Sequence, residues 1–151
     1  GFEFSDGTIL SFTQLLEKEN HQISVGNDII NGTDLNDIIY TLEGDDRLAC
    51  KAGNDKLFGG KGNDTYLFNL GDAQDTIVED NYGYDAGTND IVKLGEGISI
   101  NNLSFTASNS DLIISIKDSI GNPTGDKILI SIGLTALYTA RRLLRFIIWV
   151  Y

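Results

Sequence analysis

A nine-residue pattern repeats five times without a gap between residues 23 and 67, and it leaves this chain few ways to fold. Every unit has an aspartate at its sixth position and a large apolar residue at its eighth, and all but one have a glycine at the fourth. Three columns that stay in phase over five units indicate one structural unit repeated along the chain. The units are 23–31, 32–40, 41–49, 50–58 and 59–67.

Each unit divides into a turn and a short strand. Its first six residues are rich in glycine, asparagine and aspartate, which favour turns. Its last three residues, such as Lys56-Leu57-Phe58, form an extended segment that points one apolar side chain inward. One unit cannot bury that side chain alone, so neighbouring units have to stack. Two units then complete one coil with a turn on each side, which predicts an all-β parallel roll.

The sixth-position aspartates line both edges of such a roll. Asp28, Asp46 and Asp64 stack along one edge, and Asp37 and Asp55 stack along the other. Carboxylates about 5 Å apart repel, so each row has to be protonated, held loosely or bridged by a cation. Hard oxygen ligands without a converging histidine or cysteine favour Ca²⁺ over Zn²⁺ or Cu²⁺, and Mg²⁺ fits a flexible carbonyl cage less well. The fifth-position Asn and Asp residues are interpreted as turn formers.

The last unit, Gly59-Gly60-Lys61-Gly62-Asn63-Asp64-Thr65-Tyr66-Leu67, matches the nonapeptide G-G-x-G-x-D-x-U-x in full. The chain therefore resembles the repeat-in-toxin (RTX) proteins. Residues 72–77, 89–94 and 111–116 are similar to the haemolysin-type domain that follows such repeats, and residues 4–10 resemble the end of a preceding module. The resemblance covers about residues 1–132. It implies a right-handed parallel β-roll, secretion through a type I apparatus, and folding outside the cell when calcium is met.

The resemblance also implies that each calcium ion lies between the turns of alternate units. About three ions would be framed by three pairs of carboxylates: Asp28 with Asp46, Asp46 with Asp64, and Asp37 with Asp55. Turn carbonyls would complete these sites, including those of Gly26, Gly44, Gly53, Gly59, Gly60 and Gly62. Asp75 is a further candidate, but it follows Asp64 by eleven residues instead of nine, which argues against a fourth site with Asp55.

Some units depart from the motif. Thr33, Leu42 and Lys51 occupy the second position in place of glycine, and Leu35 occupies the fourth. A leucine held in left-handed backbone costs roughly 1–2 kcal/mol. We therefore expect the turn that contains Leu35 to lose its ion most readily.

The flanking segments predict two caps for the roll. Residues 1–22 would contain the end of a preceding module and a short capping helix at 11–19, where Ser11 and Gln14 suit a capping box. Residues 68–132 would form a β-strand cap, with strands at 103–106, 112–117 and 127–132 and a turn at 121–126. Its core would include Ile113, Ile128 and Ile130.

The tail, residues 133–151, does not fit the family pattern. It carries Arg141, Arg142 and Arg145, no acidic residue, and an apolar run at 146–151. We favour an altered terminus that forms an edge strand, and an amphipathic membrane or partner segment is the alternative.

Charge narrows the range of partners. The chain has 22 acidic and 11 basic residues, a net charge of −11. Nucleic acids and anionic membranes require basic surfaces, so we expect calcium ions as partners, no nucleic acid, and no membrane contact except through the tail. Cys50 is the single cysteine, so no intrachain disulfide forms.

Catalysis is not expected. Cys50 and His21 are the only thiol and imidazole, and both are interpreted as surface residues without chemistry. The chain starts Gly1-Phe2-Glu3-Phe4 and has no methionine, so we expect it to be part of a longer protein. The expected function is a calcium-responsive folding module of a large secreted bacterial toxin, adhesin or enzyme, outside the cell or on its surface. The alternatives are the C-terminal scaffold of a secreted protease or lipase, and a repeat block of an adhesin.

Overall fold

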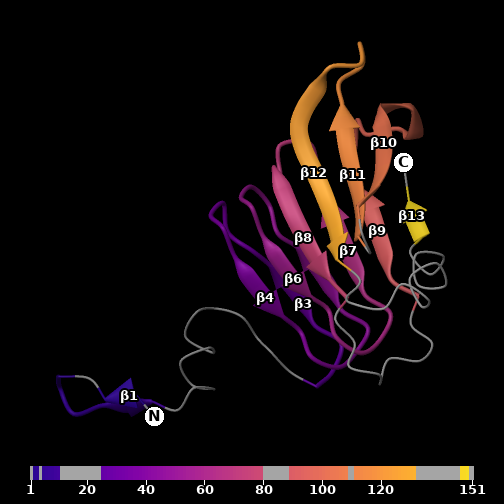
Figure 1. The fold of residues 1–151 in the computed structure, drawn as a ribbon. Helices are drawn as coiled ribbons and strands as arrows, with labels where there is room; N and C mark the ends of the chain where they lie inside the picture. Colours follow the sequence, from indigo (N-terminus) through magenta and orange to yellow (C-terminus); the bar gives the residue numbers. More distant parts are fainter. Residues whose placement is uncertain are drawn as a thin grey trace.

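The computed structural model describes residues 2–3, 5–10, 25–79, 89–108, 111–131 and 147–149. These residues are nearly all in strands and turns, as Figure 1 shows. A two-stranded antiparallel sheet is formed near the N-terminus by β1 (Phe2–Glu3) and β2 (Ile9–Leu10). The other strands form two larger sheets, which are the two walls of a roll. The predicted helix at 11–19 lies outside the described residues.

Each repeat unit supplies one short strand at its last three positions, as the sequence predicts. Strands of alternate units pair in parallel, so that Leu48 lies beside Ile30 on one side and beside Tyr66 on the other. The first sheet therefore contains every second unit, and the second sheet contains the units between them. The predicted parallel roll, with two units in each coil, is confirmed. The strands are β3 (Ile29–Asn31), β4 (Ile38–Tyr40), β5 (Arg47–Ala49), β6 (Lys56–Phe58) and β7 (Thr65–Phe68).

The parallel coils continue beyond the last repeat unit. β8 (Gln74–Val78) pairs with β6 in the second sheet, and β9 (Ile91–Leu94) pairs with β7 in the first. In the second sheet, β12 (Pro123–Ser131) then lies parallel to β8. In the first sheet, β13 (Ile147–Trp149) lies parallel to β9. Part of the tail thus forms the edge strand that the sequence favours, here at residues 147–149.

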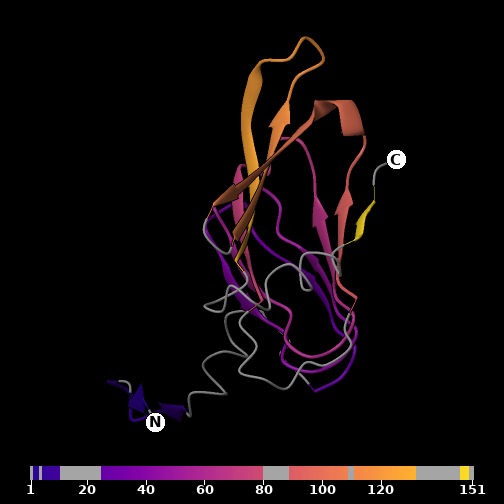
Figure 2. The ribbon, with the colours of Figure 1, turned by 45° about the vertical axis from the view of Figure 1, so that its right-hand side comes forward.

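An antiparallel extension completes the second sheet (Figure 2). A 3-10 turn, η1 (Ile100–Asn102), leads into β10 (Leu103–Ser108), and β11 (Asp111–Lys117) joins β10 to β12. All three predicted strands are present, while their role as a cap stays a prediction.

Two details of this extension differ from the sequence prediction. The turn lies at residues 118–122, before the predicted 121–126, because the Asp118 carboxylate accepts the N–H groups of Ile120 and Asn122. Ile128 and Ile130 are buried as expected, but Ile113 is only partly buried. Ile114 and Ile116 face the core instead, since successive side chains of a strand point to opposite faces.

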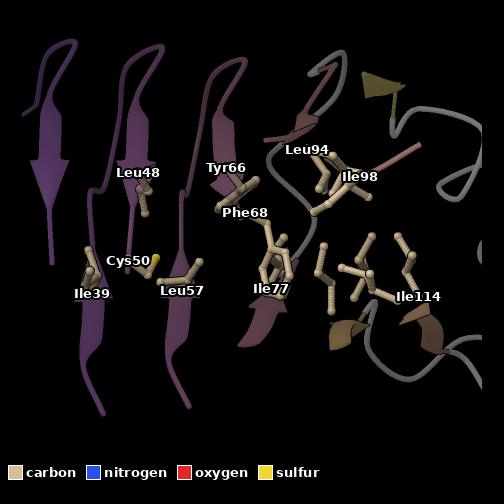
Figure 3. Close-up of a cluster of buried hydrophobic side chains, with 14 of the residues drawn as sticks. Ile39, Leu48, Cys50, Leu57, Tyr66, Phe68, Ile77, Leu94, Ile98 and Ile114 are labelled. Atoms are coloured by element: carbon tan, nitrogen blue, oxygen red, sulfur yellow. The ribbon is translucent and has the colours of Figure 1, made fainter. Parts of the chain in front are cut away.

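The core is a column of apolar side chains between the two sheets, shown in Figure 3. All five eighth-position residues belong to it, and none is more than 5% exposed. Phe68, Ile77, Val92 and Leu94 continue the column past the repeats. Full burial of one such side chain contributes roughly 1.5–3 kcal/mol, so no unit is stable without its neighbours. The eighth-position residues are Ile30, Ile39, Leu48, Leu57 and Tyr66.

Candidate metal sites at the roll edges

Carboxylates form a ladder along the first edge, which consists of the turns that lead into β3, β5, β7 and β9. The Asp28 N–H donates to Asp46 Oδ1 at 2.7 Å, and the Asp46 N–H donates to Asp64 Oδ1 at 2.9 Å. The Asp64 N–H continues the ladder by donating to Asp90 Oδ1 at 2.8 Å. Each carboxylate is therefore held against the turn of the preceding coil, and the structure brings both predicted pairs of this edge together.

A second ladder runs along the second edge, which consists of the turns that lead into β4, β6 and β8. The Asp37 N–H donates to Asp55 Oδ1 at 2.8 Å, which unites the third predicted pair. The Asp55 N–H donates to Asp75 Oδ1 at 3.1 Å, although these residues are 20 apart instead of 18. Asp75 therefore occupies the position that a further sixth-position aspartate would occupy.

Two acidic residues of the first edge were missed as site residues by sequence counting. Asp90 lies 26 residues after Asp64, but Asn89-Asp90-Ile91-Val92 repeats the Asn-Asp-apolar order of residues 27–30, and this signal would have found it. Glu79 lies close to Asp90, and the buried Tyr66 hydroxyl donates to Glu79 Oε1 at 3.1 Å. Burial, with Asp90 nearby, raises the pKa of Glu79 to about 8. The end of the first edge is thus richer in carboxyl groups than the repeats indicate.

The fifth-position side chains form ladders in the opposite direction. On the first edge, the Asp45 N–H donates to Asn27 Oδ1, and the Asn63 N–H donates to Asp45 Oδ1. On the second edge, the Asn54 N–H donates to Asn36 Oδ1 at 2.8 Å. These oxygens satisfy backbone amides of the neighbouring coil, which agrees with their interpretation as structural residues of the turns.

Buried carboxylate oxygens without partners mark both edges. Asp46 and Asp55 are each 2% exposed, and within the described part of the chain their Oδ2 atoms have no hydrogen-bond partner. A buried polar atom that lacks a partner is costly, and a charged one more so. Burial raises the pKa of Asp55, and it raises the pKa of Asp75 to about 8, with Asp55, Asp72 and Asp126 adding to the effect. A cation bound to these oxygens would give the Oδ2 atoms a partner and would compensate the buried negative charge.

The glycines allow the turns to stack with their carbonyls in contact. Gly44 and Gly53 have φ values of +132° and +133°, and an added Cβ would lie 2.6 Å from the carbonyl oxygen of Gly26 or Leu35. The carbonyls of Gly44, Gly53, Gly60 and Gly62 accept no hydrogen bond from the residues that the structure describes. The Gly59 carbonyl differs, since it accepts the Thr41 hydroxyl at 2.8 Å. Carboxylates and free carbonyls together are the oxygen donors that Ca²⁺ takes in proteins.

The expectation of strain at Leu35 is wrong. Positive φ among non-glycine residues occurs at Leu42 (+75°), Lys51 (+69°) and Ala73 (+73°), and Leu35 is not among them. Leu35 lies in the first described turn of the second edge, and its side chain is 73% exposed, so nothing forces it into left-handed backbone. Within the repeats, the strain lies instead at the second position of two later turns, at Leu42 and Lys51, and Ala73 lies beyond the repeats.

The interpretation of Cys50 as a surface residue is also wrong. Its side chain is fully buried among the core residues, beside the second edge (Figure 3). Burial, followed by the charges of Asp75, Asp55, Asp72 and Asp37, raises the pKa of its thiol. His21, the other residue considered for catalysis, lies outside the described residues.

Comparison with known proteins decides the nature of the repeats. A family model for the RTX calcium-binding nonapeptide repeat matches residues 24–49 and 51–74, in four copies. The repeat region is an RTX calcium-binding array. Within the RTX array, the ladders of both edges are therefore the candidate positions for Ca²⁺.

Two individual matches accompany the family match. The iron-regulated protein FrpA of Neisseria meningitidis serogroup C is 42% identical over 60 residues, which is 40% of this chain and 5% of FrpA. The AlgE6R3 subunit of the Azotobacter vinelandii mannuronan C5-epimerase covers 73% of this chain and 74% of its own, with 20% identity and a TM-score of 0.29. No helix in the described part of the chain has the length and apolar character needed to cross a membrane.

Proposed function

We propose that this chain is a calcium-responsive folding module of a larger secreted protein and has no catalytic role of its own. The observation that supports the proposal is the buried Oδ2 atom of Asp46 and of Asp55, which has no hydrogen-bond partner among the described residues, while the N–H of each residue donates to the carboxylate of the next coil. A ladder of this kind folds at neutral pH only when a cation compensates its charge.

The energetics of one unit support coupling between calcium and folding. Ordering nine residues costs on the order of 10 kcal/mol in backbone entropy, whereas the one buried apolar side chain returns roughly 1.5–3 kcal/mol. Residues 26–90 also contain 14 acidic and 4 basic residues, so the collapsed chain repels itself. An ion present at 100 times its dissociation constant adds about 2.7 kcal/mol for each site.

Folding that depends on calcium suits a protein that leaves the cell unfolded. In the low calcium of a cytoplasm the repeats would stay open, which a type I secretion apparatus requires, and they would fold in the higher calcium outside. Asp46 belongs to two neighbouring pairs, with Asp28 and with Asp64, so an ion at one pair orders half of the next. We therefore expect folding to be cooperative in calcium.

A calcium titration followed by circular dichroism tests the proposal. The chain should show little β signal in excess chelator and a steep, saturable gain with calcium, and magnesium should not replace calcium. The variant Asp46→Asn should shift the midpoint to higher calcium. Asp111→Asn is the matched control, because Asp111 lies on β11, which β12 separates from β8, and it belongs to neither ladder. A full β signal in chelator, or the same response to magnesium, would contradict the proposal.

The non-catalytic assignment has its own test. The chain is assayed with ester, peptide and glycoside substrates, and we expect no turnover. Turnover that disappears in Cys50→Ser or His21→Ala would contradict the assignment.

A further inference from the structure

The first position of each unit gives a side chain access to the carboxylate of the same turn. At Gly32, an added Cβ would lie 2.8 Å from Asp37 Oδ2, and at Gly59 it would meet Asp64 Oδ2. Cys50 occupies this first position in the turn of residues 50–55. Its thiol therefore points toward the Asp55 carboxylate because of its place in the repeat.

The contacts of Cys50 agree with this geometry. The Sγ atom of Cys50 and one carboxylate oxygen each from Asp55 and Asp75 all lie within 4.8 Å of one another. The three residues are 0%, 2% and 3% exposed. Asp55 Oδ1 accepts the Asp37 N–H, whereas Asp55 Oδ2 is buried and has no hydrogen-bond partner among the described residues. A cluster of two carboxylates and a thiol thus contains an oxygen that still lacks a partner.

This set of donors differs from the oxygen-only sets of the first edge. Ca²⁺ takes oxygen ligands, whereas a thiolate selects softer cations such as Zn²⁺. Burial, and then the neighbouring carboxylates, raise the pKa of the thiol, so a cation has to displace its proton on binding. Ligands around a tetrahedral zinc ion lie roughly 3.5 Å apart, so atoms at the 4.8 Å limit of this cluster would approach one another by about 1 Å.

We propose that Cys50, Asp55 and Asp75 form a mixed sulfur–oxygen site for a thiophilic divalent cation, such as Zn²⁺ or Cd²⁺, within an otherwise calcium-binding roll. The inference rests on the proposed function in one respect, since it takes the second edge to be a cation-binding edge. The Cys50 site differs from the calcium sites in its metal and in one of its ligands. The turn of residues 50–55 has a thiol at its first position, where the turns that begin at Gly32 and Gly59 have glycine.

Cadmium is the most direct probe, because its bond to a thiolate gives an ultraviolet charge-transfer band. The reduced full chain is saturated with calcium and titrated with Cd²⁺. We expect the band to rise to one equivalent, because the chain has a single cysteine. Cys50→Gly restores the glycine of the motif, so it should fold in calcium and give no band. Asp75→Asn should weaken cadmium binding by at least about tenfold, whereas Asp111→Asn on β11, which belongs to neither ladder, should leave the cadmium affinity unchanged.

Several results would overturn the inference. One is the absence of the band in excess cadmium, and another is a band of unchanged affinity in Asp75→Asn, which would mean that the thiol binds the metal without the carboxylates. If calcium induces folding but cadmium gives no band, this inference fails and the proposed function stands. If the chain is already folded in excess chelator and cadmium still gives the band, the proposed function fails and the mixed site stands.

Discussion

Replacing Gly53 with alanine measures how tightly the turns of the second edge are stacked. Gly53 has φ +133°, and the added Cβ would lie 2.6 Å from the Leu35 carbonyl oxygen. This backbone costs a non-glycine residue about 1–3 kcal/mol, and the overlap with backbone atoms adds roughly 1–3 kcal/mol. Gly121 is the matched control, since its φ is +94° but an added Cβ would meet nothing within 4 Å. We expect Gly53→Ala to lose roughly 2–6 kcal/mol of unfolding free energy, against about 1–3 kcal/mol for Gly121→Ala.

Urea unfolding in saturating calcium, followed by circular dichroism, gives the two free energies. Thermal unfolding provides a second measure, because 1 kcal/mol shifts the Tm of a domain of this size by about 2–4 °C. Gly53→Ala should also bind calcium more weakly, since its turn lies between those that carry Asp37 and Asp75. Equal losses of stability in the two variants would refute the conclusion that stacked turns bring the Leu35 carbonyl against Gly53.

Three further predictions concern the edges. Asp46→Asn should lose more bound calcium than Asp28→Asn, because Asp46 belongs to two pairs, and equal losses in calorimetry would contradict this arrangement. Lys51→Gly should raise the unfolding free energy by about 1 kcal/mol, because it relieves a φ of +69°; no gain in urea unfolding would show that the turn is not strained. In excess chelator, the pKa of Asp75 is about 8 in the folded chain, against an ordinary value of 3.8. The contribution of its protonated carboxyl group to the free energy of unfolding is therefore full below pH 3.8 and is lost as the pH rises through 8. The apo chain should therefore be more folded in acid than at pH 8, and a pH titration by circular dichroism that shows no decline would contradict this.

Much of the roll could be predicted because its contacts join residues of like position in alternate units. Ile30 and Leu48 are neighbours in the sheet, and Asp28 and Asp46 are neighbours on the ladder, for the same reason. Counting failed beyond residue 67, because the nine-residue period ends there: Asp75 follows Asp64 by 11 residues, and Asp90 follows Asp64 by 26. Asp75 still reaches its ladder because strand pairing places a residue on an edge, while extra residues can bulge from the turn.

Two other expectations that the structure contradicts concern single residues: the exposure of Cys50 and the backbone of Leu35. The burial of Cys50 depends on how the first position of a turn faces the carboxylate of that turn, which the motif does not express when glycine is usual there. Leu35 keeps an ordinary backbone, whereas Gly44, Gly53 and Gly62 at the same position of later units have φ of +132° to +133°. Both properties follow from stacking between coils, so they become visible only in the structure.

Amide hydrogen exchange, measured residue by residue with nuclear magnetic resonance, tests most directly whether calcium holds the two edges together. The amides of Asp28, Asp46 and Asp64 donate to the carboxylates of the next coil, and the amides of Asp37 and Asp55 do the same on the second edge. We predict that these amides exchange freely at neutral pH in excess chelator and become protected together as calcium is added. Strong protection of the same amides in chelator, or equal protection by magnesium alone, would contradict a calcium-dependent fold.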